Sequence, residues 1–174
     1  MARRHSASVE DYLETIMLLA EEEERVTVTR ISEEMGVTKP SVTSAIRRLV
    51  KNELATHEKY GEIHLTKKGL RVARDVYKRH QILTHFMMDV LDIKEDIASE
   101  DACRAEHCLS PVSVERLNQF MEYVESCPQG RPCWLEGFNY YLNHGKRNPE
   151  QVNSCVAGCK KIKYSKIKDS KILE

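Results

Sequence analysis

Apolar residues recur every three to four positions over most of the chain, which is the period of an amphipathic helix. The first such segment follows Ser8, which has with Asp11 the spacing of a helix-capping box. A short helix is predicted over 28–35, and a third helix follows a cap at Thr38, with Pro40 in its first turn. The inward positions expected on the first and third helices are Val9, Leu13, Ile16, Met17, Ala20, Val42, Ile46 and Leu49.

The apolar pattern changes from a helical period to strict alternation in LATHEKYGEIHLT, residues 54–66, and Gly61 lies near the centre of this stretch. Alternation around a glycine predicts a short β-hairpin. Helical spacing then returns, and helices are predicted over about 70–91, 94–108 and 112–125. The fold is therefore predicted to be mainly α-helical, with one small hairpin.

The order of elements over 28–66 is typical of a winged helix-turn-helix, with a turn at EMGVTKPS and the hairpin as the wing. If the third helix buries its apolar stripe, its hydroxyl and arginine side chains face outward. Small hydroxyls permit close approach to a major groove, and arginines contact guanine edges or phosphates. The residues predicted to contact DNA are Thr38, Lys39, Ser41, Thr43, Ser44, Arg47, Arg48 and, in the wing, Lys59. The alternative is a helical domain whose basic face is only solvated.

The chain has no net charge, but its charges are unevenly distributed. Residues 25–79 hold 13 Lys or Arg against 6 Asp or Glu, a balance of +7. Residues 80–126 hold 3 against 10, a balance of −7. This asymmetry favours polyanion binding by the first segment and cation binding by the second, with a chance fluctuation as the alternative.

The 174 residues suffice for one or two small domains, and 41% hydrophobic with 31% charged residues is ordinary for a globular protein. No apolar run approaches the roughly 20 residues of a membrane span. The start MARRHSASVEDY lacks the apolar core of a signal peptide. A cytoplasmic protein without a membrane partner is expected, and its six cysteines are expected to be thiols or metal ligands.

The stretch DACRAEHCLS places three metal-capable side chains, Cys103, Glu106 and His107, at positions i, i+3 and i+4, which share one face of a helix. Three ligands from one turn do not close a coordination shell, so further ligands must come from elsewhere. The candidates are His80, Asp11 and Glu14. Each residue taken singly also fits a structural role in a helix or core, and the spacing alone leaves both interpretations open.

The segments SVEDYLETI, RISEEMGVTKPSVTSAIRRL, LTKKG, VYKRHQIL and ACRAEHCLS occur in this order over residues 6–125. In them the chain resembles the DtxR/MntR family of metal-dependent transcriptional repressors. The resemblance implies a homodimer, with a winged helix domain followed by an all-helical dimerisation and metal-binding domain. It also implies Fe²⁺ or Mn²⁺ as co-repressor and a palindromic operator in double-stranded DNA, controlling metal-homeostasis genes.

Carried onto this sequence, the family's metal positions fall on Asp11, His80, Cys103, Glu106 and His107, with Glu14 added in the manganese-sensing branch. The chain mixes the two branches. Its Asp11 and Glu14 resemble the manganese pattern, whereas Cys103 resembles the iron pattern. Because thiolate favours iron, Fe²⁺ is expected in preference to Mn²⁺. The SH3-like domain of longer members is not expected, since 49 residues follow Glu125.

Three regions are predicted: a winged helix DNA-binding domain over 1–69, a helical dimerisation and metal-binding domain over 70–126, and a cysteine-containing extension with a basic tail over 127–174. The extension holds CPQGRPC and CVAGC, whose four thiols could bind Zn²⁺ or an iron–sulfur cluster. These thiols are Cys127, Cys133, Cys155 and Cys159. Free thiols or disulfides are the alternative.

Three classes of function follow from these features. The favoured class is a metal-gated DNA-binding repressor. A thiol or iron–sulfur redox regulator on a winged helix, using the C-terminal cysteines, is the alternative. An enzyme is not expected, because the sequence has no nucleophile elbow, oxyanion glycine loop or HExxH motif.

Overall fold

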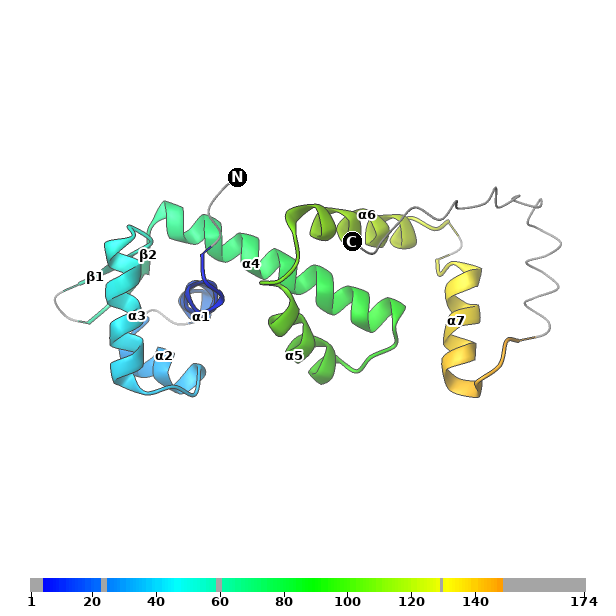
Figure 1. The fold of residues 1–174 in the computed structure, drawn as a ribbon, viewed down its shortest axis with the longest axis horizontal. Coiled ribbons are helices and arrows are strands. Elements are labelled where there is room, and N and C mark those ends of the chain that lie inside the picture. The colour runs from blue at the N-terminus through cyan, green and yellow to red at the C-terminus, as the bar shows by residue number, and fades with distance from the viewer. Residues whose placement is uncertain (1–4, 23–24, 59–60, 129, 149–174) are drawn as a thin grey trace, which may run out of the picture. The chain divides into compact units, whose positions relative to one another are not determined.

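The computed structural model describes residues 5–22, 25–58, 61–128 and 130–148. The chain divides into two compact units, residues 1–121 and 122–174, and the DNA-binding and metal-ligand candidates discussed below lie in the first unit. The elements are α1 (Ala7–Glu22), α2 (Val28–Glu34), α3 (Lys39–Lys51), β1 (Ala55–His57), β2 (Ile63–Leu65), α4 (Lys67–His85), the π-helical turn η1 (Phe86–Val90), α5 (Glu95–Ala105), α6 (Pro111–Glu125) and α7 (Cys133–His144) (Figure 1). No helix among the described residues is long and apolar enough to span a membrane.

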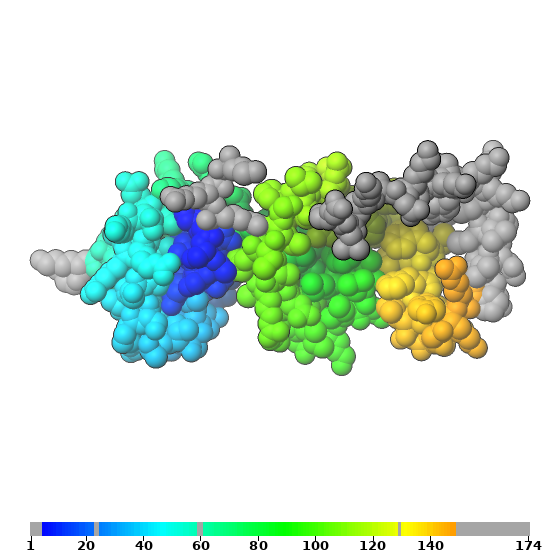
Figure 2. Space-filling view, viewed as in Figure 1, coloured from blue at the N-terminus to red at the C-terminus, as the bar shows by residue number. Residues whose placement is uncertain are grey.

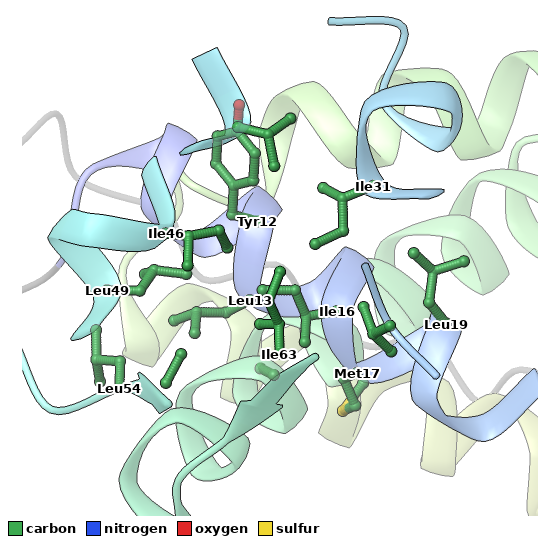
Figure 3. Packing of buried hydrophobic residues seen from close by; sticks show 14 of the residues in the cluster. Tyr12, Leu13, Ile16, Met17, Leu19, Ile31, Ile46, Leu49, Leu54 and Ile63 are labelled. Atoms are coloured by element: carbon green, nitrogen blue, oxygen red, sulfur yellow. The ribbon is translucent and has the colours of Figure 1, made fainter. Parts of the chain in front are cut away.

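Helix α1 is the centre of the N-terminal core. It contacts α2, α3, α4 and β2, so apolar side chains on several of its sides are covered. Leu13 and Ile16 are fully buried and meet Ile46 and Leu49 of α3 within one apolar cluster (Figure 3). Ala20, predicted to face inward, is exposed, whereas the neighbouring Leu19 is buried.

The predicted helix-turn-helix is present, and its third helix begins at the predicted cap, Thr38. Thr27 caps α2, with its hydroxyl accepting from the backbone N–H of Arg30, and Thr38 caps α3 in the same way for Ser41. The surfaces of α1, α2 and α3 adjoin one another in the space-filling view, in blue through cyan (Figure 2). The outer side of α3 therefore lies on the surface, while its inner side packs on α1.

The predicted hairpin is present. Strands β1 and β2 pair antiparallel, with Thr56 opposite His64. Thr66 joins the hairpin to the next helix, because its hydroxyl donates to the Glu53 carbonyl at 2.7 Å and accepts from the Gly69 N–H at 3.1 Å. The first turn of α4 is thereby held against the start of the wing.

The predicted boundaries of α1 and α4 were wrong. Helix α1 begins at Ala7, and the carbonyl of Ser6 accepts the first helical bonds, so Ser8 is not the cap. The long helix predicted over 70–91 is α-helical only to His85 and continues as the π-helical turn η1. The aromatic ring of Phe86 in this turn meets that of Phe120 edge to face, 6.1 Å between centroids.

Candidate metal centre and DNA-binding face

Three helices contribute candidate ligands to one place. Asp11 and Glu14 lie one turn apart on α1, His80 lies on α4, and Glu106 and His107 follow directly at the end of α5. Helix α4 packs against both α1 and α5, which both lie below its diagonal course in the view (Figure 1). Side chains distant in the sequence therefore converge beside α4.

These side chains form two groups, in each of which the ligand atoms lie within 4.8 Å of one another. In the first, His107 Nε2 is 2.7 Å from Asp11 Oδ1 and 3.2 Å from Glu106 Oε1. In the second, Glu14 joins His80 and Glu106, with His80 Nδ1 3.1 Å from Glu106 Oε2. The two groups share Glu106, which directs one oxygen toward each histidine.

Glu106 has no exposed surface, although it is a carboxylate. It is the C-cap of α5 and keeps helical backbone angles, with φ −59° and ψ −29°. His107 lies in the turn that follows, so the prediction that both residues belong to one continuous helix with Cys103 was wrong. The helical angles at Glu106 nevertheless direct its side chain to the face expected from the sequence.

Three atoms of the first group have no hydrogen-bond partner among the described residues: Asp11 Oδ1, Glu106 Oε1 and His107 Nε2. They are close together, but their mutual geometry does not make hydrogen bonds. Nδ1 of His107 lies 2.9 Å from a Glu10 oxygen, so when the ring is neutral and donates this proton, Nε2 carries a lone pair. Converging lone pairs on buried oxygens and a ring nitrogen repel one another unless a cation lies between them. The donor set therefore fits a divalent metal ion.

Cys103 lies beside these groups without joining either of them. Cys103 is an exposed residue on α5, one turn before Glu106. Partial burial raises the pKa of the Cys103 thiol, and the negative charges of Glu106, Asp11 and Glu14 raise it further. The thiol is thus within electrostatic reach of the carboxylates, and a cation placed among them would favour the thiolate.

Glu14 holds its proton to near neutral pH. Burial, and after it the charge of Glu106, raises the pKa of Glu14 from 4.5 to about 7. Burial also raises the pKa of Asp11, while the hydrogen bond to Glu106 raises the pKa of His80. A metal ion must displace these protons, so its affinity is expected to rise with pH.

The metal-free protein should lose thermal stability as pH rises from about 4.5 to about 7. The raised pKa of Glu14 means that the folded chain holds this proton more tightly than the unfolded chain. The contribution is therefore complete below the unfolded pKa and lost as pH passes the folded value. The raised pKa of His80 acts in the same direction above its usual 6.5. Thermal unfolding in chelator should show a shallower pH dependence for Glu14→Gln than for Glu21→Gln, an exposed position on α1; equal slopes would contradict this.

The predicted DNA-contacting residues lie on the outer side of α3 and its cap. Val42, Ile46 and Leu49 are buried, as predicted. The exposed residues are Thr38, Lys39, Ser41, Ser44, Arg47 and Arg48. Thr43 is half-buried and its hydroxyl donates to the Lys39 carbonyl at 2.9 Å, while Lys59 lies outside the described residues. A basic helix face therefore stands at the surface of the first unit.

Comparison with known protein families matches both parts of this arrangement. Residues 5–63 match the N-terminal DNA-binding domain of the iron-dependent repressors, and residues 66–135 match their metal-binding and dimerisation domain. The chain belongs to the DtxR/MntR family of metal-dependent transcriptional repressors. The family resemblance read from the sequence is therefore confirmed, as is the predicted fold class.

Known DtxR/MntR relatives cover about two thirds of this chain. An uncharacterised HTH-type transcriptional regulator of Methanocaldococcus jannaschii is 36% identical over 118 residues, which are 67% of this chain and 94% of that protein. The transcriptional regulator MntR of Bacillus subtilis is 34% identical over 68% of this chain and 82% of its own length. The solved structure of the manganese regulator SloR is 36% identical with a TM-score of 0.61, over 69% of this chain and 56% of SloR. The chain thus matches little more than half of that solved protein.

The DtxR/MntR resemblance assigns no role to the cysteines of the C-terminal extension. Cys155 and Cys159 lie outside the described residues. Cys127 is half-buried and Cys133 is exposed, and within the described ranges neither belongs to a group of three candidate metal ligands. A second zinc or iron–sulfur site therefore remains a prediction, as does redox sensing through these thiols.

Sequence reasoning missed three polar residues that contact the histidines or their partners: Glu10, Arg79 and Ser99. Glu10 is buried and contacts both Arg79 and His107, and Ser99 contacts His80. One signal was present in the sequence. Glu10 lies three and seven positions before two buried residues of α1, so it is a carboxylate on the apolar stripe itself. Such a position requires partners, which only the fold could identify.

Proposed function

We propose that this chain is a repressor activated by divalent metal, with ions bound in the two groups that share Glu106. Metal binding orders a homodimer for a palindromic operator of metal-homeostasis genes. The single observation that carries this proposal is the convergence of unpartnered ligand atoms from two parts of the first unit. Asp11 belongs to the DNA-binding part, whereas Glu106 and His107 belong to the metal-binding and dimerisation part.

Helix α1 links the metal to the recognition helix. Its Asp11 and Glu14 side chains lie toward α4 and α5, while the adjacent Tyr12 and Leu13 pack in the apolar cluster with Ile46 of α3 (Figure 3). An ion that joins α1 to Glu106 therefore restricts α3 as well. In a homodimer this fixes the two recognition helices near one DNA turn apart, roughly 34 Å. The effect is to remove a conformational cost from DNA binding.

The donor set supports Fe²⁺ or Mn²⁺, and we favour Fe²⁺. Carboxylates and imidazoles suit both ions, but the neighbouring thiol of Cys103 favours iron. When bound, either ion supplies a positive charge that neutralises the buried carboxylates. The related structure of the manganese regulator SloR makes Mn²⁺ the necessary comparison.

The proposal is tested by selecting DNA from a random pool with metal-loaded protein, then measuring affinity without oxygen in Fe²⁺, Mn²⁺ or chelator. Two-fold symmetric sites should be recovered, and metal should strengthen binding at least tenfold, with Fe²⁺ effective at lower concentration than Mn²⁺. Arg47→Ala with Arg48→Ala should weaken DNA binding without changing metal affinity, whereas Arg116→Ala on α6 should change neither. Equal DNA affinity with metal and with chelator would overturn the proposal.

A further inference from the structure

Glu10 is one of two acidic residues that the described part of the chain buries almost completely, the other being Glu106. Its side chain is 5% exposed and does not belong to either group of candidate metal ligands. The adjacent Asp11 belongs to the first ligand group, so two consecutive residues of α1 direct carboxylates to the two nitrogens of the same His107 ring. A carboxylate buried to this degree requires specific partners.

The partners of Glu10 come from the two other helices of the centre. Glu10 Oε2 accepts from Arg79 Nη2 of α4 at 2.8 Å. The same oxygen lies 2.9 Å from His107 Nδ1, at the end of α5. The Arg79 guanidinium, itself 13% exposed, supplies the balancing charge and is fixed in turn by a bond from its Nε to the Asp75 carbonyl at 3.2 Å. Glu10 is thus an anchored acceptor for one nitrogen of the ring.

A proton donated to Glu10 occupies Nδ1 of His107, so the neutral ring carries its lone pair on Nε2. This nitrogen is the one that faces Asp11 Oδ1 and Glu106 Oε1. The hydrogen bond also restricts rotation of the ring, because Nδ1 is held by Glu10 while Nε2 faces Asp11. A carboxylate in this position increases the basicity of a ligating imidazole and fixes its orientation.

His80 provides an internal comparison with the opposite arrangement. Its Nδ1 faces Glu106 Oε2 at 3.1 Å, and its Nε2 lies 3.3 Å from the hydroxyl of Ser99. The nitrogen of His80 that faces away from Glu106 therefore has a neutral hydroxyl as its partner. The corresponding nitrogen of His107 has a carboxylate that is paired with an arginine. The two histidines are held by different nitrogens and by partners of different strength.

We propose that Glu10 is a positioning residue that holds His107 in the Nδ1–H tautomer and presents Nε2 to the metal. This inference rests on the proposed function. Arg79 holds the Glu10 carboxylate in place through the 2.8 Å bond from its Nη2. Glu10 does not touch the ion. Its contribution is confined to the ion bound by Asp11, Glu106 and His107, and the ion bound by Glu14, His80 and Glu106 is independent of it.

The test is a double-mutant cycle in full-length protein, measured by Mn²⁺ titration with electron paramagnetic resonance. The His80→Ala background retains the Asp11, Glu106 and His107 group, and there Glu10→Gln should weaken Mn²⁺ binding about tenfold and Glu10→Ala by 10–100-fold. The His107→Ala background retains the Glu14, His80 and Glu106 group, and there Glu10→Gln should have no effect. Equal weakening in both backgrounds, or none in the first, would overturn the proposal.

A second measurement needs no metal. The ¹⁵N chemical shifts of histidine distinguish the two tautomers, and His107 of the metal-free parent should carry its proton on Nδ1. Glu10→Gln should reduce that population, and Ser99→Ala should leave it unchanged. An Nε2 proton on His107 in the parent would overturn the inference. If the unsubstituted protein bound no Mn²⁺, the proposed function would be overturned. If it bound Mn²⁺, but His80→Ala bound the ion equally well with and without Glu10→Gln, this inference alone would be overturned.

Discussion

Glu106→Gln should abolish metal activation while leaving the fold intact. Glu106 contributes an oxygen to each ligand group, so one substitution removes a negative charge from both ions. The amide is isosteric and still offers an acceptor to His80 Nδ1. Metal affinity should fall at least a hundredfold for each group, which corresponds to about 2.7 kcal/mol or more. DNA affinity in metal should then equal that in chelator.

The matched control for this substitution is Glu100→Gln. Glu100 lies on the same helix, is exposed, and pairs with Arg104 rather than with the candidate ligands. It removes the same charge at a distance from both ions, so metal activation should be retained. Thermal unfolding with and without Mn²⁺ provides the measurement, because an ion bound only to the folded state raises the unfolding temperature. A metal-induced shift that persists in Glu106→Gln would exclude the shared role of this carboxylate.

Gly69→Ala should destabilise the first unit by about 3 kcal/mol, at the upper end of ordinary overpacking. A Cβ at this position would lie 1.9 Å from the carbonyl oxygen of Leu54 and 2.9 Å from its carbonyl carbon. Both are backbone atoms and cannot rotate away as a side chain can. The clash would separate α4 from the wing and strain the bond from the Thr66 N–H to the Leu54 carbonyl.

Gly36→Ala distinguishes this contact from a general effect of replacing glycine. Gly36 has a φ of +64°, and a Cβ there would meet nothing within 4 Å. Gly36→Ala should lower the free energy of unfolding by only about 1–2 kcal/mol, which is the cost of placing a β-carbon in left-handed backbone. Denaturant unfolding of both variants gives the comparison. If Gly69→Ala were no more destabilising than Gly36→Ala, the close approach of α4 to Leu54 would not exist in solution.

The sequence was sufficient to predict the helix-turn-helix because each of its boundaries has a local cause. Thr27 and Thr38 cap helices through their own hydroxyls, and Pro40 fits a first helical turn. The buried face of α3 could be predicted from the spacing of its apolar residues. The sequence pattern supplied candidate ligands on three helices but left a structural role equally open, and the resemblance to a family favoured the metal site.

The errors arose where contacts distant in the sequence decide the outcome. Ala20 is exposed and Leu19 buried because α1 is packed on several sides, which a single stripe does not describe. The end of α5 at Ala105 could not be located from a segment whose helical pattern continued through His107. Glu10 was missed because its partner His107 is 97 positions away.

The end of α5 at Ala105 places a helix terminus, and not only side chains, beside the candidate ligands. The aligned peptide dipoles of a helix give its C-terminus roughly half a negative charge. This field attracts a cation at every pH, because peptide groups do not take up protons in this range. A helix terminus therefore adds a fixed attraction to ligands whose own charge depends on pH, and salt should weaken it without abolishing it.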